Sequence, residues 1–157
     1  MELTNLKKRN VVLVVDDDHR VLESLLLLLS AYGYNVVTAD SAEGALVKMQ
    51  SVAPDIVLTD VRMPGMTGIE LAGEIHDLDP EMPVIFMTAY AELELVIDAV
   101  RQGVFDFIMK PFNPDYLARA VGRARKFCEM KDQKITNSCL RRRLITKRGN
   151  CCTSAWR

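Results

Sequence analysis

The chain of 157 residues is long enough for one domain with a buried core, and its hydrophobic fraction of 49% and charged fraction of 26% are ordinary for a globular protein. Its longest apolar run, Leu25 to Leu29, is too short to span a bilayer, and residues 1–10 lack the apolar stretch and cleavage site of a signal peptide. These features argue against a membrane or exported protein, and we expect a cytoplasmic location.

Charge is distributed unevenly along the chain. Residues 1–122 contain 9 Lys/Arg and 19 Asp/Glu, a net charge of −10, whereas residues 123–157 contain 11 Lys/Arg and 2 Asp/Glu, a net charge of +9. An acidic body and a basic tail are expected to have different roles. All four cysteines lie in the tail without a C-x-x-C pair, and both histidines lie in the body, so a Cys/His metal site is not expected.

Five short apolar segments alternate with helical patterns. The predicted strands are Val11–Val15, Val36–Ala39, Ile56–Thr59, Val84–Met87 and Phe105–Met109. Three of them, the first, third and fourth, are almost continuously apolar, which is typical of strands covered on both faces.

Between the strands, apolar residues recur at the i, i+3, i+4, i+7 spacing of amphipathic helices. The stripes are Leu22/Leu25/Leu26/Leu29, Ala42/Ala45/Leu46/Met49, Leu93/Val96/Ile97/Val100 and Leu117/Ala120/Val121/Ala124. Thr67 and Glu70 have the spacing of a capping box, and Asn113-Pro114 that of a cap followed by a first-turn proline. Alternation of strand and helix predicts an α/β fold, a doubly wound five-stranded parallel sheet with helices on both faces.

Polar side chains follow four of the five predicted strands, at Asp16-Asp17-Asp18, Asp60, Thr88 and Lys110. Because ligands of open parallel sheets bind beyond the carboxyl ends of the strands, we expect these groups to meet at one edge. Three crowded carboxylates require a cation, and oxygen ligands suit Mg²⁺. A carboxylate can attack a phosphoryl group, which a lysine and a hydroxyl then stabilise. The pattern therefore predicts phosphoryl transfer to Asp60, with Asp17 at the metal.

The segments that carry these residues resemble the signatures of response-regulator receiver domains of bacterial two-component systems. They are Val-Val-Asp16-Asp17-Asp18, Asp60-Val-Arg-Met-Pro-Gly65, Met87-Thr88-Ala89 and Lys110-Pro111-Phe112, and the resemblance covers about residues 9–127. The stretch from Gln102 to Phe112 is most similar to receivers of the nitrogen-regulation, enhancer-binding class. The resemblance implies a flavodoxin-like strand order 2-1-3-4-5 and a signalling domain that is not an enzyme.

The resemblance also assigns roles to individual residues. It implies Mg²⁺ bound by Asp17 directly, by Asp16 through water, and by the phosphoacceptor Asp60 and the backbone carbonyl of Arg62. Thr88 and Lys110 are implied to contact the phosphoryl group, while Thr88 and Phe107 form a switch. A cis Lys110–Pro111 bond is expected. The bulk of Arg62 and Tyr90 beside the site implies slow self-dephosphorylation.

The expected partner is a sensor histidine kinase. Phosphorylation is expected to remodel the surface of the fourth helix, fifth strand and fifth helix, through which a homodimer could form. The output domain is missing or lies on another chain, so nucleic acid would be contacted only through that output, and no membrane contact is expected. We expect an N-terminal extension at residues 1–9, a receiver domain at 10–127 and a disordered basic tail at 128–157. This tail is either a linker remnant or a vector-derived sequence, and both interpretations stay open.

The pattern of residues is also compatible with three other kinds of protein. A haloacid-dehalogenase-type phosphatase would use the D-x-D spacing at Asp16–Asp18, but Arg20 and the early position of Asp60 disagree with its pattern. A pseudo-receiver would lack one of the site residues, and none is missing. A nucleic-acid binder would act through the basic tail, which is short for a DNA-binding domain. Alone, each site residue has a structural explanation, such as a helix cap for Asp18, and their joint occurrence at the strand ends favours the receiver.

Overall fold

The computed structural model describes residues 10–101 and 103–149, apart from the side chains of Tyr90 and residues 139–149. The strands are β1 (Val11–Val15), β2 (Asn35–Ala39), β3 (Ile56–Asp60), β4 (Val84–Thr88) and β5 (Asp106–Met109). The helices are α1 (His19–Ala31), α2 (Ala42–Val52), α3 (Gly68–Leu78), α4 (Leu93–Arg101) and α5 (Pro114–Gly149), with a 3-10 turn, η1 (Tyr90–Glu92), before α4. Each strand starts and ends within one residue of its predicted bounds.

The five strands form one parallel sheet in the order β2-β1-β3-β4-β5, which confirms the predicted fold. Successive side chains of a strand point to opposite faces of the sheet. In β1, Val12 and Val14 enter the core on one face, while Leu13 and Val15 enter the core on the other. All four are buried, which explains why the strand sequence is continuously apolar.

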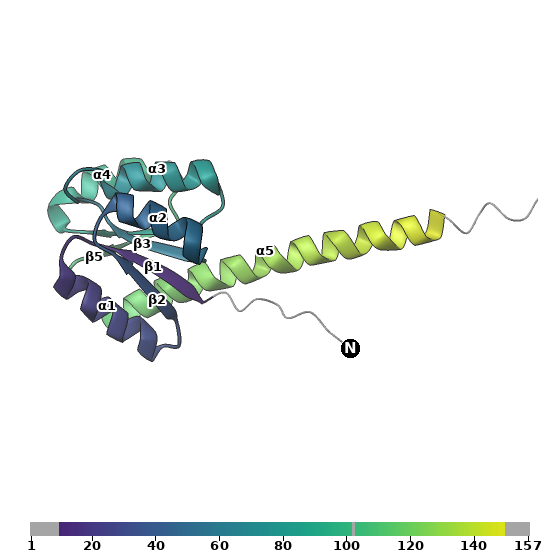
Figure 1. Cartoon of the computed structure of the whole chain (residues 1–157), viewed down its shortest axis with the longest axis horizontal. Coiled ribbons are helices and arrows are strands. Elements are labelled where there is room, and N and C mark those ends of the chain that lie inside the picture. The colour runs from purple at the N-terminus through teal and green to yellow at the C-terminus, as the bar shows by residue number, and fades with distance from the viewer. Residues whose placement is uncertain (1–9, 102, 150–157) are drawn as a thin grey trace, which may run out of the picture.

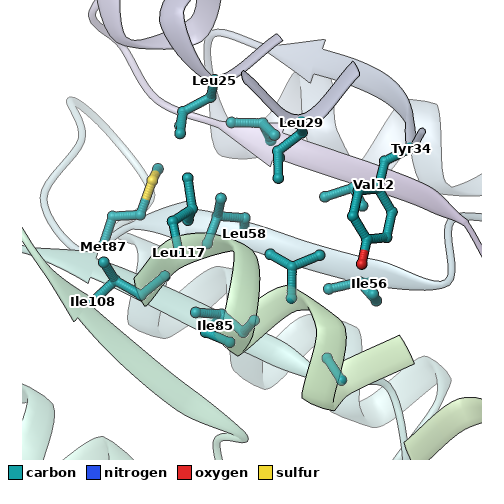
Figure 2. Packing of buried hydrophobic residues seen from close by; sticks show 14 of the residues in the cluster. Val12, Leu25, Leu29, Tyr34, Ile56, Leu58, Ile85, Met87, Ile108 and Leu117 are labelled. Atoms are coloured by element: carbon teal, nitrogen blue, oxygen red, sulfur yellow. The ribbon is translucent and has the colours of Figure 1, made fainter. Parts of the chain in front are cut away.

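Helices cover both faces of the sheet, with α1 and α5 on one face and α2, α3 and α4 on the other (Figure 1). Figure 2 shows the first core, in which Leu25 and Leu29 of α1 and Leu117 of α5 surround strand residues such as Ile56 and Ile85. The second core includes side chains of α2, α3 and α4. The predicted α4 stripe is only partly buried, because this helix packs through Val96 and Ala99 and leaves Ile97 and Val100 largely exposed.

Local capping sets where the helices begin. The Asp18 side chain accepts a hydrogen bond from the first turn of α1, and the capping box predicted at Thr67 and Glu70 is present at the start of α3. Asn113 accepts a hydrogen bond from the backbone N–H of Asp115 at 3.0 Å, as predicted for the start of α5. These caps fix the first residues of α1, α3 and α5, which follow β1, β3 and β5 along the chain.

The tail differs from the prediction, because α5 runs to Gly149 and residues 128–149 are helical instead of disordered. Two features explain the difference. No glycine or proline interrupts residues 123–148, and these residues include many strong helix formers. The helix is also attached beyond residue 127, since Lys131 Nζ lies 2.8 Å from Glu81 Oε2 and Cys128 Sγ lies 3.5 Å from the Asp55 carbonyl oxygen.

The far half of α5 extends away from the sheet (Figure 1). Residues 1–9, 102 and 150–157 lie outside the described part of the chain, so the expectations for the N-terminal extension and the last residues of the tail remain predictions. Among the described residues, no helix combines the length and the apolar character needed to cross a bilayer.

Candidate functional site: an acidic cluster at the carboxyl edge of the sheet

The predicted site residues come from neighbouring strand ends. Asp16 follows β1, Asp60 ends β3, Thr88 ends β4 and Lys110 follows β5. The parallel register places Asp60 opposite Met87, so Asp60 and Thr88 stand at adjacent ends of β3 and β4. This common edge of the sheet is where the sequence predicted the site to be.

Three carboxylates meet at this edge. One ligand oxygen from each of Asp16, Asp17 and Asp60 lies within 4.8 Å of the others. Asp16 is fully buried, Asp60 is buried except for a small fraction, and Asp17 is exposed. Asp16 is fixed by its neighbours, since its Oδ1 accepts a hydrogen bond from the Asp18 backbone N–H at 2.9 Å. Oxygen-only donors in this arrangement can hold a hard divalent cation.

Lys110 supplies the positive charge. Its Nζ lies 2.8 Å from Asp16 Oδ2 and 3.2 Å from Asp60 Oδ2, so one ammonium bridges two of the three carboxylates. The backbone N–H of Lys110 donates to the Thr88 carbonyl oxygen at 2.8 Å, which ties β5 to β4 at this point. The Lys110–Pro111 peptide bond is cis, as the resemblance implied.

Burial and the close packing of charged groups shift the pKa values of Asp60 and Lys110. Burial, followed by the negative charge of Asp16, raises the pKa of the Asp60 carboxyl above its ordinary value, although Lys110 opposes this shift. Burial also lowers the pKa of Lys110, but its hydrogen bond to Asp16 and the charge of Asp60 outweigh burial, so the pKa of Lys110 is raised. The raised pKa of Asp60 thus follows from burial beside a second carboxylate, which Lys110 offsets only in part, and the raised pKa of Lys110 follows from its contacts with both carboxylates.

Thr88 does not contact Asp60 in this structure. The Thr88 hydroxyl is 3.1 Å from the Ala89 carbonyl oxygen and 3.3 Å from Glu92 Oε2, and no hydrogen bond among the described residues joins it to Asp60. Glu92 also forms an ion pair with Arg62, at 3.0 Å between Oε1 and Nε. Glu92 is the residue near the site that sequence reasoning missed, because it lies in a turn and belongs to no strand-end pattern.

Two further predicted residues, Arg62 and Phe107, line separate cavities. Arg62 lies two positions after Asp60 and lines a cavity of about 660 Å³, which Asp17 also lines. Phe107, the predicted switch residue, is half-buried against the second core. It lines a second cavity of about 300 Å³ on the β5–α5 side, together with Ile108, Met109, Pro111, Asn113 and Tyr116. The Tyr90 side chain lies outside the described residues.

Comparisons with known proteins agree with this geometry. Residues 12–122 match the family model of the response regulator receiver domain. The regulatory protein AtoC of Escherichia coli (strain K12) is 39% identical over 124 residues, which cover 79% of this chain and 27% of AtoC. The DNA-binding transcriptional regulator NtrC of Salmonella typhimurium is 38% identical over 117 residues, which cover 74% of this chain and 25% of NtrC. The chain thus spans about a quarter of the length of these curated relatives.

A solved structure shows the same architecture. The crystal structure of a response regulator receiver domain protein from Clostridium thermocellum is 31% identical and superposes with a TM-score of 0.72, covering 74% of this chain and 94% of that protein. The family match, the similarity to this solved structure and the position of the acidic cluster at the strand ends all lead to the same conclusion. The chain belongs to the response regulator receiver domain family of two-component signalling proteins.

Proposed function

We propose that Asp60 of this receiver accepts a phosphoryl group from the phosphohistidine of a sensor histidine kinase, with Mg²⁺ as the cofactor. The observation that carries the proposal is the meeting of Asp16, Asp17 and Asp60 with the ammonium of Lys110 at one edge of the sheet. The transfer breaks the phosphorus–nitrogen bond to the kinase imidazole and forms a phosphorus–oxygen bond to the Asp60 carboxylate. The imidazole is released and takes up a proton from solvent.

Accessibility favours Asp60 over Asp16 as the acceptor. The Asp60 side chain is 11% exposed, whereas that of Asp16 is 1% exposed. Both Asp16 oxygens are engaged, Oδ1 by the Asp18 backbone N–H and Oδ2 by Lys110. A haloacid-dehalogenase-type phosphatase that used Asp16 as its nucleophile would have to free a buried carboxylate whose two oxygens each accept a hydrogen bond. The same contacts therefore argue against a phosphatase of this type.

The donors fit a divalent cation. The oxygens of Asp16, Asp17 and Asp60 are close enough to share one ion, and Asp17 is exposed to solvent. We assign Asp17, Asp60 and the backbone carbonyl of Arg62 as direct ligands and Asp16 as a ligand through water. When bound, Mg²⁺ would offset the charge of the carboxylates and of the phosphoryl oxygens. Lys110 keeps a positive charge beside the Asp60 carboxylate, and Thr88 offers a hydroxyl from the adjacent strand end.

The phosphorylated domain is proposed to act as a signal and not as an enzyme. In this account Thr88 moves toward Asp60, Phe107 turns inward, and the surface of α4, β5 and α5 changes. That surface would contact an output domain or a second receiver. The DNA-binding activity named for the relative NtrC supports an output in transcription, through a domain other than this receiver. The proposed location is the cytoplasm.

Phosphorylation by acetyl phosphate or by a phosphorylated kinase tests the proposal. Wild-type protein in Mg²⁺ should gain one acid-labile phosphoryl group on Asp60, located by mass spectrometry, and EDTA should prevent it. Asp60→Asn protein should not be labelled, because it lacks the acceptor carboxylate. Asp40→Asn is the matched control, because Asp40 also follows a strand but lies at the exposed end of β2 and should label normally. Labelling of Asp60→Asn protein at the wild-type rate would overturn the proposal.

A further inference from the structure

The carboxylate of Glu92 lies where three hydrogen-bond donors converge. Its Oε2 is 3.3 Å from the Thr88 hydroxyl and 3.3 Å from the Ala89 backbone nitrogen, and its Oε1 is 3.0 Å from Arg62 Nε. The Glu92 side chain is 12% exposed, so this acceptor is largely withdrawn from solvent. The contacts join the turn before α4 to the end of β4 and to the loop after β3.

Capping of the turn explains only part of this arrangement. A glutamate three residues into a helical turn often accepts a hydrogen bond from the preceding backbone N–H, as Glu92 does from Ala89. Capping requires neither the Thr88 hydroxyl nor the guanidinium of Arg62, and a neutral glutamine performs it as well as glutamate. The negative charge of Glu92 and its contacts with Thr88 and Arg62 therefore call for a second role.

The Thr88 hydroxyl carries a single proton and can donate it to one acceptor at a time. In the resting structure its acceptors are Glu92 and the Ala89 carbonyl, and among the described residues Thr88 has no hydrogen bond to Asp60. A phosphoryl group on Asp60 would present new anionic oxygens at the adjacent strand end. It would compete with Glu92 for the same donor.

We propose that Glu92 is a positioning residue that holds Thr88 in the resting orientation and thereby weakens the binding of a phosphoryl group at Asp60. This inference rests on the proposed function. The ion pair with Arg62 keeps the Glu92 carboxylate in place, and the charge of Glu92 makes it a stronger acceptor than a neutral carbonyl. A ligand that is bound better by one of two states shifts the equilibrium toward that state, so removing the competitor favours the phosphoryl-bound state.

Titration with beryllofluoride in Mg²⁺, followed by calorimetry and amide NMR, tests the inference. Glu92→Gln should bind beryllofluoride about fivefold more tightly than wild type, within the usual range of coupling between two sites. Before any ligand is added, its Thr88 signals should shift toward their positions in the wild-type complex. Glu94→Gln is the matched control, because it removes the same charge from an exposed position two residues further along the chain and should bind like wild type.

Two further variants separate positioning from capping. Glu92→Ala removes the cap as well as the charge, so it should lower the melting temperature yet bind beryllofluoride more tightly, as Glu92→Gln does. In a Thr88→Ala background the gain from Glu92→Gln should shrink, since the contested hydroxyl is absent. If wild type binds beryllofluoride in an Asp60-dependent manner and Glu92→Gln binds no more tightly, this inference alone is overturned. If wild type and Asp60→Asn bind equally, the proposed function falls and the inference falls with it.

Discussion

At the scale of single residues, the Lys110 ammonium occupies carboxylates that a divalent cation would also need. Its Nζ is 2.8 Å from Asp16 and 3.2 Å from Asp60. Lys110→Met removes a positive charge that repels Mg²⁺ and competes with it for the carboxylates of Asp16 and Asp60. We therefore expect the variant to bind Mg²⁺ more tightly, on the order of tenfold. Calorimetric titration with magnesium chloride measures the change. Lys126→Met, which removes the same charge from an exposed position on α5, should bind Mg²⁺ like wild type, and weaker binding by Lys110→Met would contradict this account.

Some residues of the site could be predicted from the sequence and others could not. Asp16, Asp60, Thr88 and Lys110 could be predicted because each follows or ends an apolar strand, and parallel strands bring such positions to one edge. Glu92 could not, because it lies in a short 3-10 turn where a single glutamate fits a cap or a solvated surface equally well. Its contacts depend on how two loops pack together, which spacing along the chain does not encode.

At the scale of elements, the start of α3 is constrained by its close approach to the acceptor strand. A Cβ atom at Gly68 would lie 1.8 Å from the Asp60 backbone oxygen and 3.1 Å from the Val61 Cα atom. Only glycine fits there without moving the backbone. Gly68→Ala should therefore destabilise the protein by about 3 kcal/mol or more in urea denaturation, and should slow phosphorylation of Asp60 by displacing its carbonyl.

Another glycine of α3 provides the control. A Cβ atom at Gly73 would meet no atom within 4 Å, so Gly73→Ala should stabilise the protein by about 0.5–1 kcal/mol through higher helix propensity. The two variants make the same chemical change in one helix and should have opposite signs. Similar unfolding free energies for both would show that the contact at Gly68 relaxes without cost.

The length of α5 marks a limit of prediction at this scale. Its buried stripe, which includes Leu117, Val121 and Ala124, was predicted from periodicity because it packs on the sheet. Beyond the sheet the basic composition indicated a solvated tail, yet the helix continues to Gly149. Lys131 and its ion pair with Glu81 could not be predicted, since they join residues 50 positions apart. Periodicity identifies helices that bury a face and gives little information where the helix leaves the core.

At the scale of the whole molecule, apolar side chains remain uncovered on the face proposed to change on phosphorylation. Ile97 and Val100 of α4 are 48% and 42% exposed, and Tyr116 of α5 is 44% exposed. The cavity of about 300 Å³ lined by Phe107 opens beside Tyr116. These exposed groups therefore lie on α4 and at the start of α5, two of the three elements whose surface is proposed to change.

Binding of a phosphoryl mimic at Asp60 should therefore change the structure at residues far from Asp60. Beryllofluoride with Mg²⁺ should shift amide NMR signals across residues 88–117 and increase the sedimentation coefficient to that of a dimer, because the inward state of Phe107 repacks the surface between α4 and α5. Ile97→Glu should abolish dimerisation while leaving the NMR response near Asp60 intact. Leu27→Glu is the control, since Leu27 is 74% exposed on α1, a helix that covers the opposite face of the sheet from α4 (Figure 1). Shifts confined to the immediate neighbours of Asp60, in a protein that stays monomeric, would mean that this domain accepts a phosphoryl group without switching its α4–β5–α5 surface.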